Sequence, residues 1–129
     1  MTDNVELAAR GYEAFARRDI DGLLALLDPD VVFTSLIQES EGGEYRGYEG
    51  VREFLHTVGE VLPDWRPEMV SAEDHGDAVL VKARIRVTVP DSEVPLEQVM
   101  WQVLRIRDGL GVRWDFFRTE AEARPALTP

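Results

Sequence analysis

The sequence has no cysteine among its 129 residues. This absence excludes disulfide bonds, thiol nucleophiles and thiolate metal ligands. No apolar run approaches the roughly 18 residues that a membrane-spanning helix needs. The first residues, Met1 to Asn4, are polar and acidic, unlike the basic start and apolar run of a secretory signal peptide. We therefore expect a soluble, cytoplasmic protein that has no membrane partner.

Basic residues are scarce, since 14 lysines and arginines face 25 aspartates and glutamates and leave a formal net charge of −11. A chain of this charge repels polyphosphate, so we expect no nucleic-acid partner. The pair Gly42-Gly43 is not followed by a lysine and a helix start, which argues against a phosphate-binding loop. The only two histidines, His56 and His75, lack metal-ligand spacing. We expect neither a metal site nor a cofactor.

The length and composition predict one folded domain over residues 1–129, with a loose tail from about residue 123. Apolar residues recur at helical spacing in the first half and alternate with polar ones in the second half. Asp19 is the expected N-cap of the second helix. The pattern predicts helices over 5–16, 20–27 and 48–62, and strands over 31–34, 65–72, 79–89, 96–107 and 112–119. This order predicts an α+β fold, with three helices on one face of a curved antiparallel sheet.

The last two predicted strands carry apolar residues at both parities, so both of their faces should be covered. One face would meet the helices, and the other would meet a second copy of the chain in a homodimer. A turn is expected at Asp108-Gly109, between these two strands. The register that points Gln102 inward also points Asp115 and Phe117 inward, and Trp114 and Phe116 outward. A shift of one residue would reverse the two faces.

Four stretches resemble the SnoaL-like polyketide cyclases and ketosteroid isomerase-like proteins of the nuclear transport factor 2-like superfamily. They are residues 12–33 (YEAFARRDIDGLLALLDPDVVF), 45–54 (YRGYEGVREF), 63–66 (PDWR) and 112–117 (VRWDFF). The resemblance implies a cone-shaped fold, in which a strongly bent sheet wraps around the helices and leaves a deep apolar pocket. It also implies dimerisation through the outer sheet face. The superfamily includes enzymes and binding modules, so the fold alone does not identify the function.

Isomerases of this family use a carboxylate base, a tyrosine and a protonated aspartic acid. By resemblance, the tyrosine position corresponds to Tyr12, the base position falls at or near Ser35, and the acid position falls at Gln102. A serine without a nearby histidine is no general base, and an amide has no titratable proton. These substitutions argue against standard steroid isomerase chemistry.

The SnoaL-like cyclases place their acid/base aspartate on the last strands, where Asp115 is the candidate. A carboxylate in an apolar pocket can abstract a proton next to a carbonyl, while Tyr12 or Gln102 holds the carbonyl oxygen. In the alternative interpretation, Asp115 points outward or forms a structural ion pair with Arg113, Arg118 or Arg105. The paired aspartates of the family's epoxide hydrolases are incomplete here, because Gln102 stands where the second aspartate would be.

We therefore expect a protein that binds an apolar small molecule, and that acts as a cofactor-free polyketide cyclase or isomerase through Asp115, Tyr12 and Gln102. The alternative is a non-catalytic small-molecule-binding or dimeric interaction module of the same fold. The side chains expected to line the pocket are mostly aromatic or apolar. They are Phe15, Phe33, Ser35, Phe54, Val58, Trp65, Met69, Met100 and Phe117.

Overall fold

The structure is a computed structural model that describes residues 3–34, 44–61, 66–87 and 96–128. Its helices are α1 (Asp3–Arg17), α2 (Ile20–Leu24), α3 (Gly47–Val61), α4 (Glu120–Ala123) and the 3-10 helix η2 (Arg124–Leu127). Its strands are β1 (Leu27–Thr34), β2 (Glu44–Arg46), β3 (Arg66–Asp74), β4 (Ala78–Val87), β5 (Leu96–Arg107) and β6 (Leu110–Phe117). Within these described ranges, no helix is long and apolar enough to cross a membrane.

Local sequence signals explain where the first two helices begin and end. Asp3 and Glu6 lie in the first turn of α1 and Arg17 lies in its last turn, an arrangement that complements the helix dipole. The predicted cap of α2 is confirmed, because the Asp19 side chain accepts a hydrogen bond from the Gly22 backbone N–H. However, α2 is shorter than expected, since Leu27 already begins β1.

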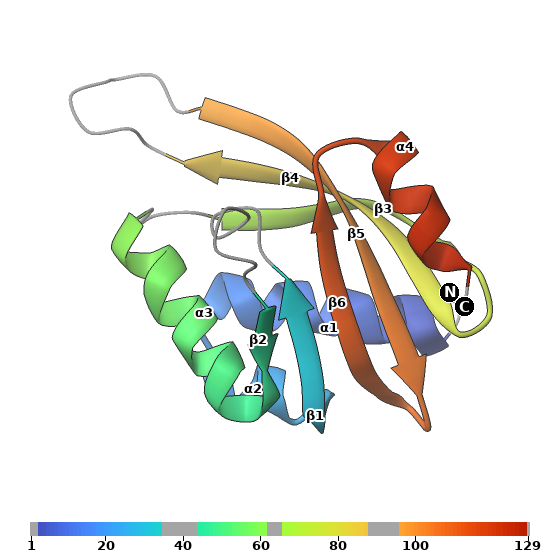
Figure 1. The fold of residues 1–129 in the computed structure, drawn as a ribbon. Coiled ribbons are helices and arrows are strands. Elements are labelled where there is room, and N and C mark those ends of the chain that lie inside the picture. The colour runs from blue at the N-terminus through green and yellow to red at the C-terminus, as the bar shows by residue number, and fades with distance from the viewer. Residues whose placement is uncertain (1–2, 35–43, 62–65, 88–95, 129) are drawn as a thin grey trace.

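The six strands form one open, mixed sheet in the order β2-β1-β6-β5-β4-β3. Every neighbouring pair is antiparallel except β1 and β6, which run parallel. The predicted α+β class is therefore confirmed, whereas a wholly antiparallel sheet was wrong for this one pair. Figure 1 shows α1 behind the strands and α4 on their opposite side. We call the side of the sheet that α1 covers the inner face, and the side that α4 covers the outer face.

A β-bulge between β5 and β6 decides which residues of β6 point inward. Next to the turn, Ile106 pairs with Gly111, but the following pair is Arg105 with Arg113, so Val112 is an extra residue in β6. Past this bulge every partner is displaced by one residue, and a displacement of one reverses the faces. The expected register, which has no bulge, was therefore wrong.

The bulge reverses four orientations that the sequence predicted. Gln102 pairs with Phe116, and Leu104 pairs with Trp114, so Trp114 and Phe116 share the inner face with Gln102. Both aromatic side chains belong to the main buried core. Asp115 and Phe117 pair with Val103 and Trp101 instead and lie on the outer face. Since cross-strand partners share a face of the sheet, Asp115 and Gln102 lie on opposite faces.

Trp114 fits into the core because α1 carries a glycine opposite it. A Cβ atom on Gly11 would lie 2.8 Å from Cη2 of Trp114, which is closer than non-bonded carbon atoms approach one another in proteins. On α3, by contrast, a Cβ atom on Gly59 would meet no atom within 4 Å. Gly11 therefore makes room for the indole ring, whereas Gly59 lies beside open space.

The chain's own C-terminal segment covers part of the outer face. Ala78, Leu80, Val103 and Ala123 form a second buried cluster there, against which Phe117 and other apolar residues pack. The backbone carbonyl of Ala126 accepts a hydrogen bond of 2.7 Å from Arg105 Nη2. Contrary to the expectation of a loose tail, residues 123–127 are helical and packed against the sheet.

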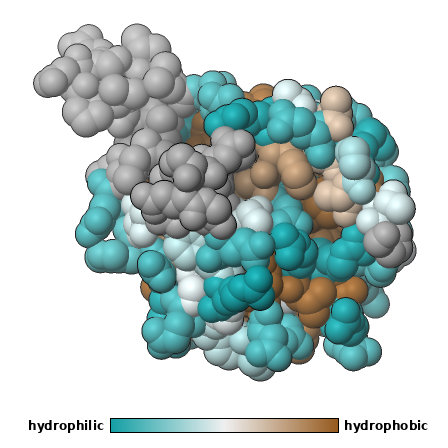
Figure 2. All heavy atoms as spheres, viewed as in Figure 1, coloured by the Kyte–Doolittle hydropathy of each residue, from teal (hydrophilic) through white to brown (hydrophobic). Residues whose placement is uncertain are grey.

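The rest of the outer face is mixed in character. Val99 is exposed, and the ammonium group of Lys82 lies 5.7 Å from the ring centroid of Trp101. At one end of the strands, Arg86 forms a 2.6 Å ion pair with Glu97. Figure 2 shows hydrophobic patches separated by hydrophilic side chains on the face that carries α4. The homodimer through this face stays a prediction, with a smaller apolar area than the sequence suggested.

If the dimer forms on the outer face, replacing Val99 by glutamate should separate it into monomers. A charge buried in the middle of an interface without a partner is strongly unfavourable. Sedimentation velocity should show a dimer for the wild-type chain and a monomer for Val99→Glu, with unchanged circular dichroism. A monomeric wild-type chain at tens of micromolar would contradict the predicted dimer.

Two glycine-to-alanine substitutions should shift stability in opposite directions. Gly59→Ala should raise the free energy of unfolding by roughly 0.5–1 kcal/mol, because alanine is the better helix former and has room there. Gly11→Ala should lower it by about 1–2 kcal/mol, because the new methyl group collides with Trp114. Urea unfolding of both variants measures the difference. Equal stabilisation by both would show that Gly11 does not make room for the indole ring.

Candidate functional site

Gln102 of β5 lies at the centre of a buried polar cluster and is only 2% exposed. Its Oε1 accepts two hydrogen bonds, one from the Tyr12 hydroxyl of α1 and one of 2.6 Å from Trp114 Nε1 of β6. An indole N–H can only donate, so the amide atom that faces Trp114 has to be the oxygen. Hydrogen-bond chemistry therefore requires the same direction of the Gln102 amide that the structure shows.

Tyr12 is the second donor of this cluster. Burial raises the pKa of Tyr12 well above its usual value, because a phenolate would lose its hydration there. The hydroxyl thus keeps its proton at physiological pH and donates it to Gln102. Tyr12 and Gln102, both site candidates by resemblance, are hydrogen-bonded to one another in the structure. The Tyr12 hydroxyl donates its proton to Gln102, so that proton is not available to a second acceptor.

The Gln102 amide nitrogen, unlike the amide oxygen, is not used by Tyr12 or Trp114. Among the described residues, Nε2 has no hydrogen-bond partner. In the same part of the chain, no fully buried polar side-chain atom lacks a partner. Nε2 therefore accounts for exposed surface of Gln102 and can donate to a ligand.

An aromatic shell surrounds the cluster. The Trp114 ring lies 5.9 Å from Tyr12, 5.7 Å from Phe15 and 5.5 Å from Phe33, measured between ring centroids. Further rings extend this network, with Phe54 lying 5.6 Å from Phe33. Such a surrounding excludes water and strengthens each hydrogen bond inside it.

Most of the expected lining residues do lie on the inner side of the sheet. Four are in the buried core: Phe15, Phe33, Phe54 and Val58. Met69 and Met100 are partly buried and pack against that core. Phe117 was placed wrongly, because it lies on the outer face. Ser35 and Trp65 lie outside the described residues.

Asp115, the expected acid/base residue, has ordinary structural partners on the outer face. One carboxylate oxygen accepts from the Thr34 hydroxyl at 3.1 Å, and the other from Arg113 Nε at 2.8 Å. This hydrogen bond raises the pKa of the Arg113 guanidinium. Arg105 lies directly opposite Arg113, so the carboxylate of Asp115 offsets a repulsion between like charges. Of the interpretations left open, the outward, ion-paired Asp115 agrees with the structure.

Gln102 is the only buried polar or charged residue, tyrosine aside, that the described ranges contain. No carboxylate of these ranges is therefore buried beside it to serve as a base. Trp114 is the site residue that the sequence prediction missed. The sequence signal for it is Gly111 near the turn, since a glycine inside a strand often marks a bulge. A Cβ atom there would lie 2.9 Å from Cδ2 of Leu27.

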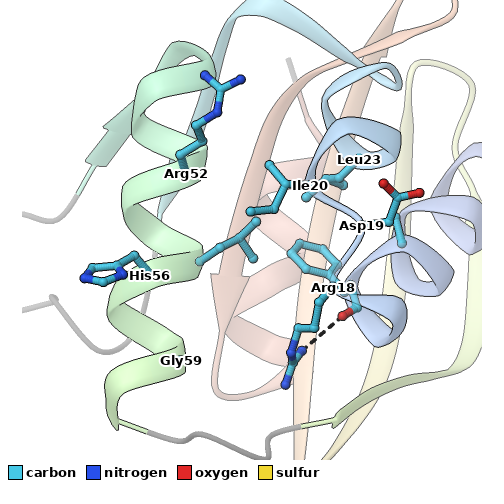
Figure 3. A pocket seen from close by; sticks show the side chains of 10 residues that line it. Arg18, Asp19, Ile20, Leu23, Arg52, His56 and Gly59 are labelled. Atoms are coloured by element: carbon cyan, nitrogen blue, oxygen red, sulfur yellow. Dashed lines mark hydrogen bonds between the residues drawn. The ribbon is translucent and has the colours of Figure 1, made fainter.

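A separate groove of about 220 Å³ lies between α1, α2 and α3. Figure 3 shows Ile20 pointing across it, while Arg52 and His56 of α3 direct their polar ends away from Ile20. Phe15 forms part of the groove wall and also contacts Trp114. This groove is therefore separated from the Gln102 cluster by a single aromatic side chain.

Comparisons with known proteins agree with this geometry. The family model of the SnoaL-like domain matches residues 8–114. The fold is similar to TerC co-crystallised with polyporic acid, at 25% identity and a TM-score of 0.81 over 99% of this chain and 100% of that one. A protein of the nuclear transport factor 2-like class from Burkholderia pseudomallei has 27% identity and a TM-score of 0.81, with both chains covered completely.

A third similar structure is a putative polyketide cyclase from Sinorhizobium meliloti. It has 22% identity and a TM-score of 0.70 over 90% of this chain and 94% of that one, which shows a shared fold. No curated protein matches the sequence. Since the family model spans most of the sequence and the fold agrees with it, this chain belongs to the SnoaL-like domain family.

Proposed function

We propose that this domain binds an apolar small molecule on the inner side of its sheet, and that the Gln102 amide nitrogen holds a carbonyl oxygen of that molecule. The proposal rests on the difference between the two ends of the Gln102 amide. Its oxygen is saturated by Tyr12 and Trp114, while Nε2 has no partner among the described residues. Nε2 is accessible at the surface of Gln102, so its N–H groups can donate to a ligand.

The surface near Gln102 supports an apolar ligand. Met100 precedes Gln102 by two residues on the same face of β5, and it pairs with Ala83 of β4. Ala83 in turn pairs with Met69 of β3, so three apolar side chains cross the sheet in one row. Both methionines are only partly buried, and flexible thioether side chains adapt to ligands of varied shape. TerC, which shares the fold over its whole length, was co-crystallised with polyporic acid.

Binding is favoured over catalysis by the chemistry of the cluster. An amide can donate a hydrogen bond but cannot take up or release a proton near neutral pH. Abstraction of a proton next to a carbonyl needs a base within hydrogen-bond reach. Among the described residues no buried carboxylate lies at Gln102. The cluster is therefore suited to hold a carbonyl oxygen rather than to move a proton.

Replacing Gln102 by leucine should weaken the binding of a tricyclic ketone about tenfold or more, since the hydrogen bond from Nε2 to the ketone oxygen is lost. The ligand 9-fluorenone serves as the ketone, and fluorene, which lacks the oxygen, serves as its control. Isothermal titration should show that Gln102→Leu binds fluorene as the wild type does, which reports that the apolar surface around residue 102 is intact. Unchanged affinity for 9-fluorenone would contradict the proposed role of Gln102.

A cofactor-free cyclase or isomerase is the second candidate function. It is favoured by the position of Asp115, whose side chain is 14% exposed and lies at an open depression of about 500 Å³ on the outer face. Thr34, Arg105 and Arg113 line the same depression. In this case the catalytic carboxylate would act on the outer face and not beside Gln102.

The substitution Asp115→Asn distinguishes the two candidates. If binding at Gln102 is the function, affinity for 9-fluorenone should not change, and unfolding should cost about 1 kcal/mol less because Arg113 loses its charged partner. If catalysis is the function, the wild type should speed deuterium exchange next to the carbonyl of 2-tetralone in D₂O, and Asp115→Asn should abolish that effect. Proton NMR follows the exchange.

A further inference from the structure

We propose that Trp114 fixes the direction of the Gln102 amide and thereby restricts the site to ligands that present a hydrogen-bond acceptor. This inference rests on the proposed binding site at Gln102 and adds the chemical class that the site selects. Ketones, quinones and other compounds with an exposed carbonyl oxygen belong to that class. Ligands that offer only an N–H or O–H donor should be rejected.

The two partners of Gln102 Oε1 differ in what they tolerate. A tyrosine hydroxyl can donate or accept, so Tyr12 could satisfy either end of the amide. The indole N–H of Trp114 can only donate. If the amide turned over, Nε2 would face Trp114 Nε1, and two buried donors would lie opposite one another without an acceptor. Trp114 alone therefore determines which end of the amide faces the ligand.

The indole ring cannot easily move to avoid this constraint. Trp114 is 1% exposed, and its ring contacts Phe15 edge-on and Phe33 at a tilt. Gly11 of α1 lies against the far edge of the ring, where a Cβ atom would have to come within 2.8 Å. Core packing of this density holds a side chain in one orientation. The strand and the helix therefore keep Nε1 directed at Oε1.

The expected selectivity for acceptor ligands arises because a ligand donor would face the Nε2 donor and leave both groups unpaired. A carbonyl oxygen next to Nε2 accepts one of its N–H groups, so both ends of the Gln102 amide then have a partner. A donor in the same place would face Nε2 with neither group satisfied, and such mismatches discriminate strongly in buried sites. Trp114 thus acts as a positioning residue that works through Gln102 without a direct contact to the ligand.

The test compares two variants that each remove one donor from the same oxygen. In Tyr12→Phe, Trp114 still holds the amide, whereas in Trp114→Phe the amide can turn over and pair its NH₂ with the Tyr12 oxygen. The probes are 9-fluorenone, which only accepts, carbazole, which only donates, and fluorene, which does neither. All three have similar tricyclic shapes, so the affinity ratio isolates the polar group.

Wild type and Tyr12→Phe should bind 9-fluorenone about tenfold or more tightly than carbazole, the factor expected for one matched hydrogen bond. In Trp114→Phe the ratio should fall to within about twofold, because both amide orientations become available. A purely structural role of Trp114 would weaken all three ligands equally and leave the ratio unchanged. An equal ratio in the two variants would overturn the inference.

NMR spectroscopy of the Gln102 side chain needs no ligand, so it tests the positioning role of Trp114 separately from the proposed ligand binding. In ¹⁵N-labelled protein, the Gln102 side-chain amide should give one pair of proton peaks in wild type and in Tyr12→Phe. In Trp114→Phe it should broaden or split. If these spectra behave as stated but no probe binds the wild type, the proposed function fails while the positioning role of Trp114 stands. Sharp, single peaks in Trp114→Phe would overturn that role.

Discussion

One extra residue in β6 decides which chemistry the inner face of this domain contains. Val112 has no partner of its own in the ladder, and beyond it the inner face receives Trp114 and Phe116 instead of Asp115 and Phe117. Without the bulge, a carboxylate would face the core next to Gln102. With the bulge, an indole N–H faces it. The contrast between an inner face that could move protons and one that could hold the carbonyl oxygen we propose thus follows from backbone register.

The bulge depends on neighbours that accommodate it. The Gly111 backbone N–H donates to the Leu26 carbonyl at 2.9 Å, which ties this point of β6 to the start of β1. On the helical side, Gly11 leaves the space that the Trp114 ring fills. Two glycines, one in a strand and one in a helix, therefore permit a single aromatic residue to reach Gln102. The Gln102 oxygen then joins α1, β5 and β6 through its two hydrogen bonds.

Periodicity was enough to predict the α+β class and most helices and strands, whereas Tyr12 and Gln102 became site candidates only through the family resemblance. The periodic features repeat along many residues, so a local error does not remove them. The faces of β6 were predicted wrongly because the expected register has no bulge, and the bulge reverses every face beyond Val112. The alternation of Val112, Trp114 and Phe116 with Arg113 and Asp115 is the sequence signal that favours the observed faces. The packed C-terminal segment was missed for a different reason. Its few apolar residues, such as Ala123, have no periodic pattern and depend on the sheet surface that they cover.

The most direct test of this account is a crystal structure of the protein with 9-fluorenone bound. We expect the ketone oxygen on the inner side of the sheet, about 2.7–3.2 Å from Gln102 Nε2, with Trp114 Nε1 still bonded to Gln102 Oε1. Asp115 should keep its contacts with Arg113 and Thr34 on the opposite face. A ketone bound against Asp115, or one whose oxygen has no contact with the Gln102 amide, would contradict the account.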